Sequence, residues 1–214
     1  MIYIQKFTFN PFQENSYIVY NEDKKAIIID PGMYEPNEFK QFFKFIEQYD
    51  LEPVMLLNTH THLDHVFGNA QVLNKFQIPF GFHELDKVVF DNANAVGLMY
   101  GMTVEKSPEP TFYIHENETI QLGKDSFKIL FTPGHSPGSV CFYNQAQNIV
   151  ISGDVLFQQS IGRTDLPGGN YETLMNSIHA ELMALPNETI VYCGHGPETT
   201  IGSERMNNPF LTMR

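Results

Sequence analysis

The stretch His60-Thr61-His62-Leu63-Asp64-His65 (HTHLDH) places four candidate metal ligands within six residues. Neutral imidazole nitrogens and ionised carboxylate oxygens are the ligands that zinc, iron and manganese accept in proteins. The alternative is a polar loop whose histidines only cap a helix or contact water. Because metal sites become more common as ligand density rises, the stretch favours a metal site.

The apolar run at 54–57, just before this stretch, predicts a short buried strand. Ligands two residues apart in an extended chain project the same way, so His60 and His62 can share one ion. Where the chain then begins to turn helical, Asp64 and His65 would point at a second position beside the first. The local spacing therefore leaves room for two ions.

Composition indicates a folded protein and disfavours nucleic-acid binding. The chain has 214 residues, which we expect to form a single domain over 1–214. Apolar residues make up 42% and charged residues only 18%, enough for a substantial core without a signature of disorder. Thirteen basic against 25 acidic residues give a net charge of −12, which repels phosphate backbones.

The amino-terminal stretch 1–12 alternates apolar and polar residues, which predicts a strand rather than a signal peptide. No window has the length and apolarity of a membrane span, so no membrane partner is expected. Cys141 and Cys193 lie in apolar, strand-like runs, which is typical of buried free thiols in a reducing compartment. We therefore expect a cytoplasmic protein, and the sequence leaves its oligomeric state open.

Strands and helices alternate irregularly along the chain. Alternating or β-branched runs predict strands at 2–9, 15–21, 25–30, 53–58, 78–82, 111–115, 119–122, 126–132, 139–144, 148–152 and 189–193. Helical apolar spacing predicts helices at 36–49, from the ligand stretch to about Phe76, and at 84–98, 171–185 and 198–206. This order fits an α+β fold of two sheets packed face to face, with helices on the outer faces. The irregular stretch 157–170 is the best candidate for a functional surface loop.

Three later residues share one context: a strand, a glycine, the ligand and a turn. They are His135 in TPGHSPGS, Asp154 in ISGDVLF and His195 in VYCGHGP. Glycine beside a ligand lets the backbone pass close to an ion without a side-chain clash. Each residue alone reads more simply as a turn or cap residue. Their recurrence in the same context, together with HTHLDH, favours metal binding.

The remaining histidines lack this context, and we assign none of them to metal. His83 opens a helix-like segment, so capping is its expected role. His115 lies in a polar edge, and His179 lies off the apolar stripe of its helix.

The motif HxHxDH followed by His135, Asp154 and His195 resembles the metallo-β-lactamase superfamily. Within it, the sequence is most similar to glyoxalase II, the hydroxyacylglutathione hydrolases, and to their short single-domain members. The resemblance runs from the DPG turn at Asp30 to the end of the chain. It implies an αββα sandwich of two mixed β-sheets flanked by helices, with the site along one edge. It also implies the metal ligands: His60, His62 and His135 for the first metal, Asp64, His65 and His195 for the second, and Asp154 as the bridge.

Two divalent ions, zinc first with iron or manganese as alternatives, can hold a bridging hydroxide near neutral pH. Asp64 can orient the attacking water or accept its proton. A thioester suits such a site because a thiolate leaves without a strong general acid. The expected function is a glyoxalase II-like thioesterase that cleaves a small 2-hydroxyacyl thioester resembling S-lactoylglutathione.

Two departures from relatives bear on the substrate. A common dinuclear β-lactamase would use a cysteine ligand, whereas the matching positions here are Asp154 and His195. Full-length glyoxalase II holds glutathione with a basic carboxy-terminal extension, and this chain ends at Arg214 without one. Arg163, in SIGRTD, could bind a substrate carboxylate or form only a surface salt bridge. The alternative functions are a mononuclear iron oxidoreductase of the persulfide dioxygenase type and a non-catalytic metal-binding protein.

Overall fold

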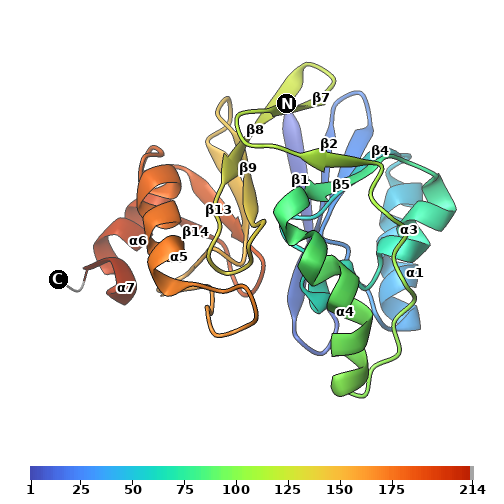
Figure 1. Ribbon diagram of the computed structural model, residues 1–214. Coiled ribbons are helices and arrows are strands. Elements are labelled where there is room, and N and C mark those ends of the chain that lie inside the picture. Colours follow the sequence, from blue (N-terminus) through green and yellow to red (C-terminus); the bar gives the residue numbers. More distant parts are fainter. Residues whose placement is uncertain (213–214) are drawn as a thin grey trace.

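The computed structural model describes residues 1–212, and two six-stranded sheets form its centre (Figure 1). The first sheet has the order β1-β2-β3-β4-β5-β6. Its strands are β1 (Ile2–Phe9), β2 (Glu14–Asn21), β3 (Lys25–Ile29), β4 (Glu52–Leu57), β5 (Phe80–His83) and β6 (Phe112–Ile114). Pairing is antiparallel from β1 to β3 and parallel from β3 to β6, so the sheet is mixed.

The second sheet has the order β14-β13-β10-β9-β8-β7. Its strands are β7 (Thr119–Leu122), β8 (Asp125–Phe131), β9 (Val140–Asn144), β10 (Ile149–Gly153), β13 (Ile190–Cys193) and β14 (Thr199–Thr200). β13 runs parallel to β10, and the other neighbours pair antiparallel. A separate small hairpin joins β11 (Leu156–Phe157) to β12 (Ser160–Ile161).

The main core lies between the two sheets, because alternate residues of each strand point toward the opposite sheet. It includes Ile27, Ile29 and Leu57 from the first sheet and Ile129, Phe142 and Ile151 from the second. All six are at most 2% exposed. The strands predicted at 25–30 and 126–132 are present as β3 and β8.

Helices cover the two outer faces, as Figure 1 shows. On the first sheet lie α1 (Pro36–Gln48), α3 (Asn69–Phe76) and part of α4 (Lys87–Met99), and Phe42, Val72 and Phe90 bury their side chains there. On the second lie α5 (Tyr171–Ser177), α6 (Ile201–Asn207) and α7 (Pro209–Thr212). The predicted α+β class and the αββα sandwich are therefore confirmed.

The structure differs from the predicted elements at several boundaries. The helix expected from the ligand stretch to Phe76 is divided into α2 (Leu63–Val66) and α3, because the Gly68 N–H donates to the Pro31 carbonyl at 2.7 Å. The predicted helix 171–185 ends instead in a π-helical turn, Ile178–Leu182. The stretch 157–170, expected to be irregular, contains β12.

Two predictions about burial and membranes can be compared with the structure. Cys141 and Cys193 are buried free thiols, as expected. Between residues 1 and 212, no helix combines the length and apolarity needed to cross a bilayer.

Candidate metal centre

The first cluster joins the loop after β4 to the loop after β8. One ring nitrogen from each of His60, His62 and His135 lies within 4.8 Å of the others. His62 Nδ1 is 2.8 Å and His60 Nε2 is 3.2 Å from His135 Nε2. These three nitrogens converge: His60 and His62 lie together as their spacing predicts, and His135 joins them as the family resemblance implies.

The second cluster joins α2 to the end of β13. Asp64, His65 and His195 each direct one ligand atom into a common space. Asp64 Oδ2 lies 3.2 Å from His195 Nε2 and 3.8 Å from His65 Nε2. Asp64 and His65 are in the first turn of α2, where the chain becomes helical, so the expected change in side-chain direction is present.

Asp154, directly after β10, lies between the two clusters. Its Oδ1 is 3.5 Å from His65 Nε2, and its Oδ2 is 3.5 Å from both His135 Nε2 and His195 Nε2. The neighbouring Gly194 permits this approach, since a Cβ there would lie 2.0 Å from Asp154 Oδ1. The carboxylate thus faces both histidine clusters at once.

The second nitrogen of most of these imidazoles is held by a hydrogen bond, which fixes the nitrogen that faces the centre. The partners of Nδ1 are Thr59 Oγ1 for His60 (3.1 Å), Asp30 Oδ2 for His65 (3.1 Å), the Arg163 carbonyl for His135 (2.7 Å) and the Phe12 carbonyl for His195 (3.1 Å). Each of these histidines therefore presents Nε2 to the centre.

Asp30 is a positioning residue that sequence reasoning named only as the start of a turn. Its carboxylate accepts from the Thr59 backbone N–H (2.7 Å), the Thr59 hydroxyl (2.5 Å) and the Asn58 amide (3.3 Å), besides His65. It lies close to His60 and His65, but its lone pairs are engaged. We therefore place it behind the ligands rather than among them.

Asp86 is a second positioning residue, and sequence reasoning missed it. It ends the 3₁₀ turn Glu84–Asp86 after β5 and is fully buried. Its carboxylate accepts from the Thr61 N–H (2.5 Å) and hydroxyl (2.9 Å), from the Ser136 hydroxyl, and from the Gly138 N–H (2.8 Å). It thereby ties the loop carrying His60 and His62 to the loop carrying His135. No local sequence signal marks this role, since its partners lie 25 to 52 residues away.

The first cluster is electrostatically prepared for a cation. Burial, reinforced by the neighbouring His135, lowers the pKa of His62 to about 3. Burial and the nearby His65 hold the pKa of His60 well below its usual range. Both imidazoles are therefore neutral at pH 7 and can donate a lone pair.

In the second cluster, without metal, contacts with carboxylates outweigh burial and raise the pKa values of the histidines. Burial opposes protonation of His195, but its bonds to the Asp154 and Asp64 carboxylates outweigh burial and raise its pKa to about 10. The same two carboxylates overcome burial at His65 and raise its pKa well above the usual value. In turn, the pKa of Asp154 is held well below its usual range, because His65 and His195 outweigh the effect of burial.

The donor set fits divalent metal. His65 Nε2 and Asp154 Oδ1 are buried, have no hydrogen-bond partner, and face the same space. Leaving such groups unsatisfied is costly, and a cation would satisfy both. Imidazole with carboxylate is a donor set that zinc, iron and manganese share.

The three histidines not assigned to metal lie outside these clusters. His83 Nδ1 accepts from the Leu85 N–H at 3.3 Å, so the predicted capping role is confirmed. Within residues 1–212, neither His115 nor His179 belongs to a group of potential metal ligands.

A cleft of about 450 Å³ opens over the two clusters. Its floor includes His62, Asp64, His135, Asp154 and His195. Its walls are Phe12, Leu63, Val96, Tyr100, Phe157, Ser160, Ile161, Arg163 and Leu166. The candidate ligands therefore lie at the base of a space large enough for a small substrate.

Arg163 lines this cleft, but its guanidinium is paired. Nε and one terminal nitrogen each donate to a different oxygen of Asp165, both at 2.7 Å. The salt bridge expected as one alternative is present, and binding of a substrate carboxylate stays a prediction.

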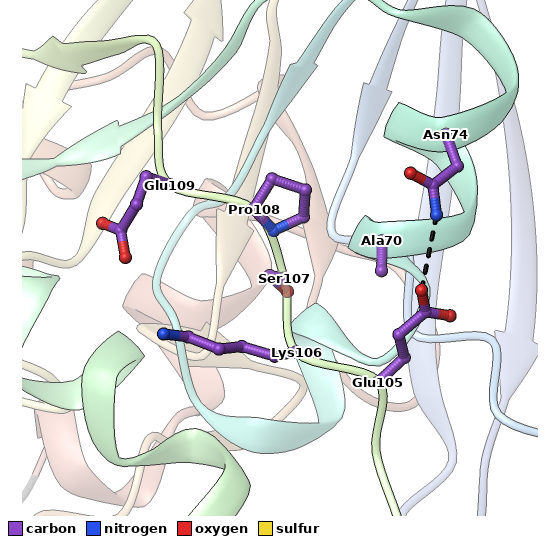
Figure 2. A pocket seen from close by; sticks show the side chains of 7 residues that line it. All are labelled: Ala70, Asn74, Glu105, Lys106, Ser107, Pro108 and Glu109. Carbon is purple, nitrogen blue, oxygen red and sulfur yellow. Dashed lines mark hydrogen bonds between the residues drawn. The ribbon is translucent and has the colours of Figure 1, made fainter.

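A second hollow, of about 340 Å³, lies between α3 and the segment 105–109 (Figure 2). There Glu105 accepts hydrogen bonds from Gln71 (3.0 Å) and Asn74 (3.4 Å). Its lining contains neither histidine nor cysteine and shares no residue with the cleft over the ligands. We therefore place the functional site in the cleft and not in this hollow.

The fold and these clusters agree with the comparison to known families. The chain belongs to the metallo-beta-lactamase superfamily, whose sequence pattern matches residues 9–195. The superfamily part of the predicted resemblance is thus confirmed. Together with the relatives below, it supports a metal-dependent hydrolase as the general class.

Two curated relatives align along nearly their whole length. The chain is 42% identical over 203 residues to "Probable metallo-hydrolase YqgX" of Bacillus subtilis, covering 94% of this chain and 93% of the relative. It is 38% identical over 205 residues to "Hydroxyacylglutathione hydrolase GloC" of Haemophilus influenzae, covering 95% of each.

Solved structures show the same fold. The BLEG-1 B3 metallo-beta-lactamase superposes with a TM-score of 0.90 at 40% identity, covering 99% of this chain and all of the other. TTHA1623, solved in a di-iron-bound form, superposes with a TM-score of 0.87 at 38% identity, covering 97% of this chain and all of the other.

Proposed function

We propose that this protein is a dinuclear metal-dependent thioesterase that hydrolyses a 2-hydroxyacyl thioester to an acid and a thiol. The observation that carries the proposal is Asp154, whose two oxygens face the His135 side and the His65 side from one side chain. In this assignment His60, His62 and His135 would hold the first ion, and Asp64, His65 and His195 would hold the second. Asp154 would serve both.

Bound divalent ions would supply a nucleophile at neutral pH and would polarise the thioester carbonyl. The chain itself contributes a water-orienting group, because Asp64 Oδ2 lines the cleft beside His195. Asp64 is therefore our candidate for orienting the attacking water and accepting its proton. A thiolate leaves without protonation. The reaction therefore does not require a general acid among the described residues that line the cleft.

The relatives support this choice without deciding the substrate. The name of the Haemophilus protein is the reason to test a hydroxyacylglutathione first. The di-iron form of TTHA1623 makes iron as reasonable a metal as zinc. The likeness to a B3 metallo-beta-lactamase makes a β-lactam the necessary competing substrate.

The test is a substrate panel on protein reconstituted separately with zinc, iron and manganese. Thiol release from S-lactoylglutathione and simpler lactoyl thioesters is measured beside β-lactam hydrolysis and oxygen uptake with a persulfide. We expect thiol release that a chelator abolishes and metal restores. Oxygen uptake with one iron per chain and no thiol release would favour the dioxygenase alternative. Metal binding without turnover of any substrate would favour a non-catalytic role.

A further inference from the structure

The walls of the cleft differ in chemistry from its floor. Six of the wall residues are apolar or aromatic: Phe12, Leu63, Val96, Phe157, Ile161 and Leu166. Tyr100 adds a further ring and is 59% exposed. Apolar side chains that stay exposed around a concave site commonly mark the surface that contacts a ligand.

The aromatic walls are continuous with the second ligand cluster. The Phe12 ring contacts the Tyr100 ring edge-on at 5.5 Å and stacks on Phe67 at 6.3 Å. The Phe12 carbonyl accepts from His195 Nδ1, and the Phe157 ring lies 6.2 Å from the His195 ring. A substrate that reaches the metal ligands must therefore place its substituents against these rings.

The described lining of the cleft has few groups that could bind a negatively charged substituent. Of the lining residues that the structure describes, Arg163 is the one lysine or arginine. Asp165 engages its guanidinium in two parallel hydrogen bonds, and the chain as a whole carries a net charge of −12. A carboxylate placed here would have to compete with Asp165 for the Arg163 guanidinium.

From these contacts we propose that the cleft selects thioesters whose substituents are apolar and uncharged, in preference to thioesters of glutathione. The inference rests on the thioesterase function proposed above. Glutathione carries two carboxylates, whereas Arg163 is the one lysine or arginine among the described residues of the lining, and Asp165 already pairs with it. Phe12, Tyr100 and Phe157 are then specificity-determining residues, and Asp165 acts through Arg163 to exclude charged carriers.

The experiment compares lactoyl thioesters of glutathione and of benzyl mercaptan, with each kcat/KM divided by the alkaline hydrolysis rate of the same compound. We expect the benzyl thioester to be favoured at least about tenfold, the scale of discrimination by apolar pockets. Tyr100→Ser should reduce that preference mainly through a higher KM for the benzyl thioester. Tyr100→Phe should retain the preference.

A second pair of variants tests the exclusion of charge. Asp165→Asn frees Arg163, so kcat/KM for the glutathione thioester should rise while that for the benzyl thioester is unchanged. The double variant Asp165→Asn/Arg163→Gln should lose the gain. Asp165 suits this test because its side chain is 67% exposed, so its replacement leaves the core intact.

The outcomes separate this inference from the proposed function. A wild-type protein that prefers the glutathione thioester, with Asp165→Asn giving no gain, would overturn the inference while leaving the thioesterase standing. Failure of the metal-replete protein to release thiol from either compound would overturn both.

Discussion

The floor and the walls of one cleft are built in opposite ways. On the floor His135 is almost fully buried, as is His60 beside it, and a hydrogen bond fixes each ring. On the walls, Tyr100 is 59% exposed, and the nearby end of α4 carries Met99 at 85% exposure. The floor is thus held rigid for one chemistry, whereas the walls can vary without disturbing it. The difference teaches that reaction class and substrate choice depend on separate parts of the chain.

The rigidity of the floor comes from carboxylates that do not face the cleft. Asp30 holds Thr59 and His65, and Asp86 holds the two loops of the first histidine cluster together. Such outer partners orient ligands and tune their affinity for metal. The walls are held by other contacts, such as the ring contact of Phe12 with Phe67 and the hydrogen bond from the Phe12 N–H to Asn10 Oδ1 at 2.9 Å.

Loss of Asp154 should have the largest effect. Asp154→Ala removes the carboxylate that faces both clusters, so we expect activity to fall on the order of a hundredfold to a thousandfold or more. Thioester turnover and bound metal per chain are measured together. Asp125→Asn, at the amino end of β8 beside the chain's terminal amine, serves as the control. Full activity in Asp154→Ala would show that the site is assigned wrongly.

Asp86→Asn should have the second-largest effect, which we expect on metal affinity. An amide offers one acceptor oxygen where the carboxylate offers two, so the link between the two ligand loops weakens. We expect metal affinity to fall about tenfold to a hundredfold, with the visible spectrum of the cobalt-substituted protein altered.

The matched control for Asp86 is Glu204→Gln. Glu204 is also a fully buried carboxylate and accepts from Thr199 (2.5 Å), Gln159 (2.8 Å) and Asn208 (2.8 Å), but it contacts no candidate ligand. It should change stability without changing the cobalt spectrum. Equal spectral changes in both variants would show that Asp86 stabilises the fold in general and does not specifically position the metal ligands.

The two clusters should also respond differently to pH. In metal-free protein, His195 has a pKa raised to about 10, whereas that of His62 is lowered to about 3. Below pH 10 a metal at the second cluster must displace protons, so its affinity should rise as pH rises from about 6 to about 8. At the first cluster His60 and His62 are already neutral over this range, so these two ligands release no protons when metal binds.

Calorimetric titration in buffers of different ionisation enthalpy counts the protons released at each step. We expect metal bound at the second cluster to release more protons than metal bound at the first, because His65 and His195 have raised pKa values. Equal release at both steps would contradict the assigned difference between the clusters.

Changes at the exposed end of α4, beside the wall, should have the smallest effect on folding. Met99→Ser at the exposed end of α4 should alter the free energy of unfolding by no more than about 0.5 kcal/mol. By contrast, Leu174→Ala, on the buried face of α5, should lower the free energy of unfolding by about 2–5 kcal/mol. Urea unfolding of both variants checks this, and comparable losses would mean that the end of α4 is part of the folded core.

The comparison also explains which features could be predicted from the sequence. Ligands on the floor follow local rules: HTHLDH leaves a strand, and His135, Asp154 and His195 each follow a strand and a glycine. Strand periodicity likewise predicted the two sheets. Features that depend on distant partners could not be found this way.

Three such features stand out. Asp86 receives its role from Thr61, Ser136 and Gly138, which only the folded chain brings to it. The break between α2 and α3 depends on a hydrogen bond from Gly68 to Pro31. The contribution of Arg163 to the floor is its backbone carbonyl, which holds His135, and no side-chain pattern reports on that.

The most direct test of the central claim is a metal titration of the chelator-treated protein, with thioester hydrolysis followed at each addition. If Asp154 bridges two ions, activity should reach its plateau at two equivalents per chain, and Asp154→Ala should not reach it. A plateau at one equivalent, with the second bound weakly or not at all, would contradict a dinuclear hydrolase.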